Sequence, residues 1–191
     1  KKITIPPKIT TISSHLFYGC FDLASVTMLG NITSIDEYAF AFTDIDKFDF
    51  YEKITYIGDD VFMNCKFLKY VKITDSVTFL GEKAFGSSGL LNLTIPPKIT
   101  KVPNSLCSVC SYLKLVVIPD NVTTIGLQAF RFCERLTTIK IPEKVTSIEG
   151  YAFSGCDILP NLLIPNSVEK IGHYAFSKCL AFTNMTIPPK V

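Results

Sequence analysis

Six of the seven cysteines recur at one position of a repeating pattern, which makes the thiol the most regular reactive group in the chain. They are Cys20, Cys65, Cys110, Cys133, Cys156 and Cys179, and Thr43 and Ser88 occupy the same position in two further repeats. A buried free cysteine behaves as a small apolar side chain. Stacked repeats would hold equivalent Cβ atoms about 5 Å apart, whereas a disulfide needs about 3.8 Å. The pattern therefore predicts a ladder of reduced, buried thiols.

The seventh cysteine forms a C-x-x-C pair, Cys107-Ser-Val-Cys110. Redox chemistry at such a pair needs an exposed helix N-terminus and a lowered thiol pKa. Cys107 stands where most repeats have phenylalanine, so both cysteines fall in columns that we expect to be buried. A zinc site would need two more ligands, and neither a second C-x-x-C nor a histidine pair supplies them. We predict no redox centre, no metal and no other cofactor.

Residues that could support catalysis are scattered along the chain. The two histidines, His15 and His173, stand seven repeats apart, and at about 4.8 Å per repeat they cannot share a site. There is no nucleophile elbow, Gly-rich phosphate loop or H-E-x-x-H motif. The sequence therefore predicts that the chain is not an enzyme.

An acidic cluster surrounds the third predicted strand. Its members are Asp44, Asp46, Asp49 and Glu52, with Asp59 and Asp60 close by. A calcium site is one interpretation, but the spacing differs from that of an EF-hand loop. We expect a solvated acidic face.

An internal repeat of 22 or 23 residues accounts for most of these positions. One aromatic column reads Phe17, Phe40, Phe62, Phe85, Cys107, Phe130, Phe153 and Phe176. One aliphatic column reads Ile9, Ile32, Ile54, Val77, Ile99, Val122, Val145, Val168 and Val191. Columns that stay in phase over eight units indicate a repeat architecture, in which each unit buries its apolar face against its neighbours.

The unit that starts at Leu136 shows which elements must position these columns. Ile139 and Ile141 alternate with polar residues, which is the pattern of a half-buried strand, and Pro142 ends it. A second extended piece covers residues 145–148. The next apolar residues are spaced by four, four and three, which predicts one face of a short helix or helical turn: Ile148, Ala152, Cys156 and Leu159.

Stacking of these units predicts an α/β, right-handed solenoid of about eight repeats with one parallel β-sheet. The in-phase alternation places its strands near residues 3–5, 25–28, 47–50, 70–73, 92–95, 115–118, 138–141, 161–164 and 184–187. Glycines such as Gly58 and Gly126 follow the second extended piece, where we expect a chain bend.

The units resemble the BspA-like, or Treponema-type, leucine-rich repeats. The family pattern Leu-x-x-Ile-x-Ile-Pro-x-x-Val-x-x-Ile-Gly-x-x-Ala-Phe-x-x-Cys is followed closely by residues 116–133 and 163–179, and Thr43 and Cys107 depart from it. The resemblance implies a leucine-rich-repeat horseshoe or arc. It also implies a surface protein of the kind that bacteria and protozoan parasites use for adhesion and for binding host or matrix proteins. The family defines no catalytic residues that could be carried over.

The outward positions of the predicted sheet are mostly Thr, Asn and Lys, with a few apolar exceptions. These exceptions are the candidate partner-binding residues Tyr70, Leu115, Val117 and Leu163. Exposed apolar residues on a repeat face indicate a partner site. The sequence therefore predicts a non-catalytic protein-binding or adhesion scaffold. The alternative is a structural spacer, or a self-assembling repeat protein without a dedicated ligand.

Composition and chain ends narrow the remaining possibilities. A net charge of +2 does not indicate a nucleic-acid partner, and no apolar run approaches the ~18 residues of a membrane span. We expect residues 1–191 to form one solenoid domain. The chain begins and ends inside the same motif, at residues 3–9 and 185–191, which suggests a fragment of a longer array that could associate end to end. Four glycosylation sequons weakly favour a secreted or cell-surface location.

Overall fold

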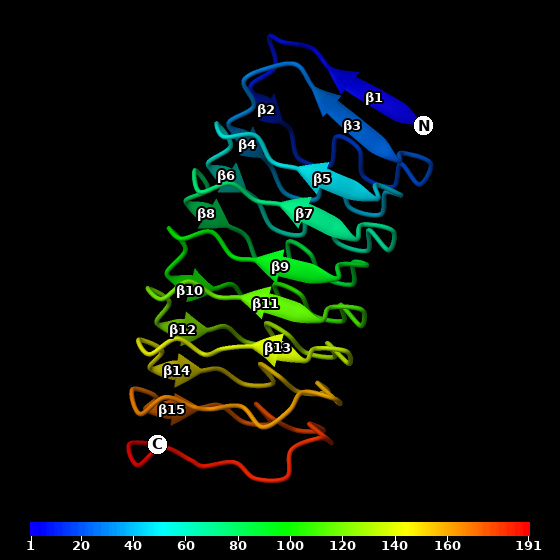
Figure 1. Cartoon of the computed structure of the whole chain (residues 1–191). Helices are drawn as coiled ribbons and strands as arrows, with labels where there is room; N and C mark the ends of the chain where they lie inside the picture. Colours follow the sequence, from blue (N-terminus) through cyan, green and yellow to red (C-terminus); the bar gives the residue numbers. More distant parts are fainter.

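The chain winds into a stack of coils, each one repeat long, in a computed structural model that describes residues 1–191 (Figure 1). Each coil contributes one strand to a first row and a shorter strand to a second row. The first row contains β1 (Lys2–Ile5), β3 (Ser25–Met28), β5 (Lys47–Asp49), β7 (Tyr70–Lys72), β9 (Asn92–Thr94), β11 (Leu115–Val117) and β13 (Thr138–Ile139). The second row contains β2 (Thr11–Ile12), β4 (Ser34–Ile35), β6 (Tyr56–Ile57), β8 (Phe79–Leu80), β10 (Lys101–Val102), β12 (Thr124–Ile125), β14 (Ser147–Ile148) and β15 (Lys170–Ile171).

Every strand pair is parallel and joins equivalent residues of neighbouring coils. Ile3 lies opposite Val26 in the first row, for example, and Ile125 opposite Ile148 in the second. The parallel solenoid with repeats of about 23 residues is therefore confirmed. Equivalent side chains form columns along the stack, because the register never shifts within a paired segment.

The columns build one continuous apolar core of 50 buried residues. The phenylalanine column is its spine, and Phe40, Phe62, Phe85, Phe130 and Phe153 are fully buried. Successive rings stack with centroid distances of 5.5 Å for Phe40–Phe62 and 5.6 Å for Phe130–Phe153. Cys107 interrupts the column between Phe85 and Phe130.

Three parts of the predicted fold are wrong. The structure contains no helix, and its strands form two rows in place of one sheet. The second extended piece, which the sequence analysis placed at residues 145–148, is the second-row strand β14. The strands predicted at 161–164 and 184–187 are absent, and these residues belong to no helix or strand. The chain is an all-β solenoid, not an α/β one.

A ladder of stacked turns replaces the predicted helix. The backbone N–H groups of His15, Phe17 and Gly19 donate to carbonyls of the next coil at 3.0, 2.9 and 2.9 Å. Left-handed residues stand four positions apart in each turn, with φ near 58° at His15 and 68° at Gly19. A helix is about 10 Å wide and satisfies its N–H groups internally. It cannot repeat at the strand spacing of about 4.8 Å unless the stack fans out.

Shortened coils interrupt the first row. The step between equivalent strand residues is 23 residues from Lys2 to Ser25, but 22 from Ser25 to Lys47 and again from Tyr70 to Asn92. Strand pairing is lost at these two short steps, between β3 and β5 and between β7 and β9. A turn that lacks one residue brings the following strand in at a shifted position, so its backbone no longer meets the previous strand in register.

A proline interrupts the second row. After each second-row strand, a backbone N–H donates to the preceding coil, as Gly81 does to Ile57 at 2.8 Å and Gly126 does to Val102 at 3.0 Å. Pro103 occupies this position after β10 and has no N–H to donate. The glycines at this position in other coils allow two backbones to approach closely and do not mark a bend. A Cβ on Gly81, for example, would lie 2.3 Å from the Gly58 carbonyl carbon.

Both rows are therefore unpaired at one junction, between the coil of β7–β8 and the coil of β9–β10. Figure 1 shows the wider separation of β8 and β10. We call this junction the seam. The motif Thr-Ile-Pro-Pro-Lys at residues 4–8 returns at 94–98, directly after it. The seam thus separates two blocks of four coils.

Replacing Phe130 with alanine should lower the free energy of unfolding by about 3–5 kcal/mol, because it empties part of the core spine. The cost is large because Phe130 is fully buried and its ring stacks on Phe153 at a centroid distance of 5.6 Å. Urea denaturation measures the change. Phe67→Ala is the control, since Phe67 is 56% exposed, and it should cost less than about 1 kcal/mol. An equally small loss for Phe130→Ala would show that the spine is not the core.

Candidate interaction surface

The first row presents alternate side chains to solvent. On β11, Val116 points into the core and is 3% exposed, whereas Val117 is 46% exposed and Leu115 is half-buried. Period-two alternation thus places two apolar side chains on the outer face of one strand. Leu115 and Val117 are the part of the predicted site that the structure brings together.

Tyr70 and Leu163 also point outward but stand apart from that pair. Tyr70, on β7, is 57% exposed, and the coil that carries Asn92 separates it from Leu115. Leu163 is 78% exposed. It is the equivalent of Val117 two coils later, and Lys140 holds the same position in the coil between them. The four predicted residues therefore form a central pair and two outlying side chains, not one contiguous patch.

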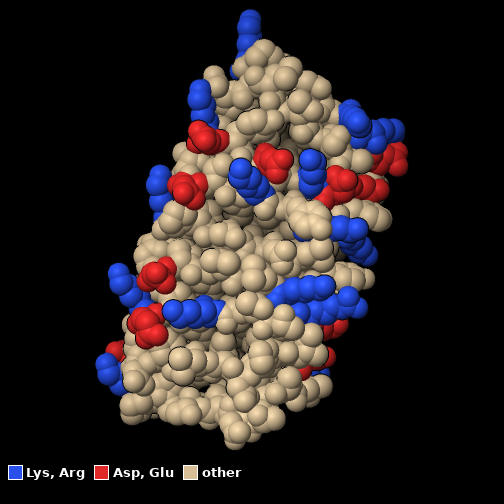
Figure 2. Space-filling view, viewed as in Figure 1, with Lys and Arg blue, Asp and Glu red and all other residues tan.

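Charge is unevenly distributed over the face that Figure 2 shows. Lysines and acidic residues gather over the N-terminal coils and along the edges, while the lower part over the C-terminal coils is largely free of them (Figure 2). Leu163 belongs to these C-terminal coils.

The sequence analysis missed an exposed aromatic pair on the second row. Tyr56 on β6 and Phe79 on β8 stack with ring centroids 4.7 Å apart and an interplanar angle of 8°. They are 40% and 45% exposed. The signal was present in the outward column of the second extended piece, where most coils have Thr, Ser or Lys.

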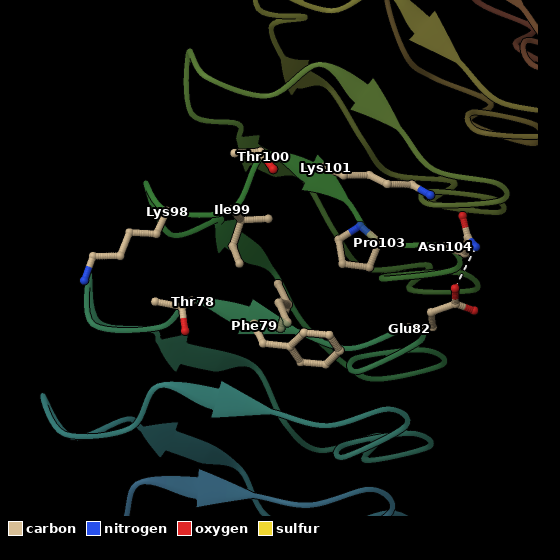
Figure 3. Close-up of a pocket in the computed structure, with 10 residues that line it drawn as sticks. Thr78, Phe79, Glu82, Lys98, Ile99, Thr100, Lys101, Pro103 and Asn104 are labelled. Carbon is tan, nitrogen blue, oxygen red and sulfur yellow. Dashed lines mark hydrogen bonds between the residues drawn. The ribbon is translucent and has the colours of Figure 1, made fainter.

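Phe79 borders a cleft of about 290 Å³ at the seam (Figure 3). Leu80, Ile99 and Pro103 also line it, and polar side chains surround them: Thr78, Glu82, Lys98, Thr100, Lys101 and Asn104. Both amide atoms of the Asn104 side chain form hydrogen bonds. Nδ2 donates to Glu82 Oε1 at 2.7 Å, and Oδ1 accepts from the Leu127 N–H at 3.0 Å. The cleft is therefore bordered on one side by an immobilised polar pair.

The cysteine column is a hydrogen-bonded ladder. The thiols of Cys65, Cys110 and Cys156 donate to the carbonyls of Phe40, Phe85 and Phe130 at 3.1, 3.0 and 3.2 Å. This role as a small donor explains why Thr and Ser can occupy the same column. All seven cysteines are free, as predicted. The exception to burial is Cys20, in the first coil that the structure describes, which is exposed.

Burial makes the ladder thiols poor nucleophiles. It raises the pKa of Cys65 and of Cys179 to about 11. In the C-x-x-C pair, both cysteines are fully buried, and burial raises the pKa of Cys107 well above its ordinary range. A reactive thiol needs exposure and a lowered pKa, so the geometry of this pair does not favour redox exchange.

One serine, histidine and glutamate do meet at the first coil. Ser14 Oγ lies 2.7 Å from His15 Nδ1 and donates to Glu37 Oε1 at 3.3 Å. In a catalytic triad the carboxylate orients the histidine, but here it binds the serine, and all three residues are exposed. This arrangement does not prepare the serine for attack.

The acidic residues around the third strand do not converge on one site. Asp59 Oδ1 accepts from the Glu82 N–H at 2.7 Å, and Asp60 lies 3.6 Å from Lys83 Nζ. Asp46, Asp49 and Glu52 are exposed to solvent. No three Asp, Glu, His or Cys side chains converge closely enough to hold a metal ion.

The repeat can be compared with known families now that its geometry is described. A BspA-type leucine-rich repeat region matches residues 1–114 and 100–191, with six copies. The chain belongs to the BspA-type leucine-rich repeat family. No curated protein matches the sequence, so no function is transferred from a characterised relative.

Solved structures similar to this BspA-type chain come from several bacteria. A leucine-rich cell surface protein from Faecalibacterium prausnitzii is 26% identical, with a TM-score of 0.66, over 97% of this chain and 59% of that protein. The Treponema pallidum leucine-rich repeat protein is 24% identical, with a TM-score of 0.77, over 83% of this chain and 78% of that one. The pneumococcal vaccine antigen PcpA is 18% identical, with a TM-score of 0.52, over 100% of this chain and 62% of that one.

The BspA-type chain thus resembles a bacterial cell surface protein, and it shares its fold with a pneumococcal antigen. It spans less than two thirds of each of these two proteins. The structure holds no helix of the length and apolarity that a membrane span requires.

A native thiol titration of this BspA-type chain should find one reactive cysteine, Cys20, and all seven after unfolding. Ellman's reagent with and without denaturant measures the two numbers, and Cys20→Ser should abolish the native reaction. Fast labelling of several thiols in the native state, or an intramolecular disulfide in non-reducing mass spectrometry, would contradict the ladder.

Stability should fall at alkaline pH because the ladder thiols have raised pKa values. Unfolded cysteine loses its proton near pH ~8.5, whereas folded Cys65 keeps its proton until about pH 11. Between these values the folded state binds more protons, so the free energy of unfolding declines as pH rises, by up to about 1.4 kcal/mol per pH unit for each such thiol.

Urea melts at a series of pH values above about 8 test this decline. Lysines and tyrosines also titrate there, so the comparison of two variants is decisive. Cys65→Ala should have a shallower decline than the parent chain, and the exposed-site control Cys20→Ala should follow the parent. Equal slopes for all three proteins would show that the buried thiol does not contribute.

Proposed function

We propose that the chain is a non-catalytic protein-binding module of a cell-surface protein, and that it adheres to a host surface or extracellular-matrix protein. Its contact surface is the first-row face around Leu115 and Val117, with Tyr70 and Leu163 at the flanks. The observation that carries this proposal is the exposure of Val117, at 46%, and Leu163, at 78%, at outward positions that in most other coils hold Thr, Asn or Lys.

The energetics of binding favour this face. Exposed apolar side chains gain free energy when a partner removes them from water, at about 25 cal/mol per Å². A few such residues surrounded by polar neighbours match the anatomy of a protein interface, with its apolar centre and wet polar rim. The surface is also pre-organised, since interstrand hydrogen bonds and the core hold β9, β11 and β13 in register. Binding then costs little ordering entropy.

The similarity to the F. prausnitzii cell surface protein supports the proposed location. A spacer without a ligand is the rival function, and the experiment below separates the two.

Surface plasmon resonance against a panel of purified extracellular-matrix proteins tests the proposal. The variant Leu115→Ser/Val117→Thr/Leu163→Asn should weaken binding to the matching protein at least about tenfold, because it removes the apolar centre of the interface. Val117 and Leu163 are exposed and Leu115 is half-buried, so a thermal melt first checks that the variant folds.

The control is Tyr112→Ser/Leu127→Ser, two residues that are 51% and 41% exposed and lie in the turns, outside the first row. It should bind like the parent chain. Equal loss in both variants would contradict the assigned face. Failure of every panel member to bind the parent chain would favour the spacer.

A further inference from the structure

The seam opens a gap of defined width in the second row. No Cα atom of β8 lies within 8 Å of a Cα atom of β10, whereas paired strands lie about 4.8 Å apart. Two such spacings come to about 9.6 Å. The separation of more than 8 Å between β8 and β10 thus approaches the distance that would accommodate one additional strand between them.

The two edges of the gap, residues 78–80 on one side and residues 100–101 on the other, carry backbone groups without backbone partners. We call these edges the lips of the gap. In the junctions on either side, the Thr78 N–H donates to the Thr55 carbonyl at 2.8 Å, and the Thr123 N–H donates to the Thr100 carbonyl at 2.9 Å. Across the seam, the Thr100 N–H has no such acceptor and the Thr78 carbonyl no such donor. The Leu80 carbonyl also lacks a donor, because Pro103 has replaced the residue that would supply it.

The cleft is closed at one end and open at the other. At the closed end, the Lys83 N–H donates to the Asn104 carbonyl at 2.9 Å and Asn104 Nδ2 donates to Glu82. Figure 3 shows this pair on one side of the cleft and Lys98 on the opposite side. Lys98 also borders a second hollow of about 550 Å³, next to Lys72 and Thr74. A chain segment can thus enter past Lys98 and run toward Asn104.

We propose that an extended peptide segment of a partner protein binds in this cleft as an added strand between β8 and β10. Its N–H groups donate to the Thr78 and Leu80 carbonyls, and its carbonyls accept from the lip of β10. This is strand addition at an exposed edge, with two edges in place of one. Four-stranded pieces on either side would then join into one continuous second row.

Side chains around the cleft restrict which peptide fits. The core behind it is closed, with Leu80 and Ile99 only 5% exposed, so a residue that points inward has to be small. Outward residues meet the free face of the Phe79 ring, whose other face stacks on Tyr56. The proposal goes beyond the proposed function, because it concerns the second row and not the face around Leu115.

The test uses the blocked peptide acetyl-Ala-Thr-Thr-Ala-Gly-amide. It copies second-row residues 122–126 with alanine in place of Val122 and Ile125, which are both fully buried in the chain. Titration into the ¹⁵N-labelled full chain should shift the amide resonances of residues 78–82 and 100–104 and leave β11 and β13 unchanged. The same peptide with N-methylated backbone amides should bind at least about tenfold more weakly, because it cannot donate to the lips.

Pro103→Gly is the matching protein variant. It supplies the missing N–H, so the Leu80 carbonyl should gain a partner within the chain and peptide affinity should fall at least about tenfold. Pro160→Gly, at an exposed position outside the seam, is the control and should bind normally. Should Pro103→Gly fail to fold in a thermal melt, the comparison of the two peptides on the parent chain decides.

Four outcomes would overturn the proposal. They are the absence of shifts at the solubility limit of the peptide, equal binding of the N-methylated peptide, unchanged affinity in a folded Pro103→Gly variant, and shifts of the same amides by methyl glucoside or methyl galactoside alone. The last would assign the cleft to saccharides. The face around Leu115 is unaffected by any of these variants, so failure here and failure of the proposed function are distinguishable.

Discussion

Hydrogen bonding between successive coils is the constraint on which the rest of this structure depends. Backbone N–H groups of each coil donate to carbonyls of a neighbouring coil, in both strand rows and in the turns. That bonding sets the repeat distance along the stack to about 4.8 Å. Phenylalanine rings then stack, thiols reach carbonyls of the preceding coil, and glycine is needed at Gly81, where two backbones nearly touch. It also explains why turns with left-handed residues replace a helix.

The places where this bonding fails give the molecule its distinctive surfaces. One residue fewer in the turn before β9 and a proline after β10 together leave the seam unpaired in both rows. The apolar face around Leu115 lies on an intact, paired segment, β9–β11–β13. The chain thus combines a rigid sheet face with a cleft whose backbone groups are free to bind. A repeat protein can obtain both from small departures in a few coils, because each coil contacts only its neighbours.

Most of the fold could be predicted from the sequence, because the repeat is dense. The burial of the Phe40–Phe62 column and the reduced state of Cys65 follow from their in-phase recurrence. The helix was predicted from Ile148, Ala152 and Cys156, whose spacing of four residues suits a helical face. Stacked turns produce the same spacing, since residues 148, 152 and 156 are all buried in them. Local periodicity cannot distinguish the two, because the deciding quantity is the distance to the next coil.

The sequence by itself determined the repeat, the parallel stacking, the identity of the core columns and the outward direction of Tyr70, Leu115, Val117 and Leu163. Each of these follows from the spacing of residues within one repeat, which is the same however closely the coils stack. Only the tertiary structure decided how far apart those four side chains lie, that Cys20 is exposed, and that β8 and β10 are separated at the seam. These features depend on whether neighbouring coils meet in register, which a single missing residue or one proline can change while the pattern of the repeat stays intact.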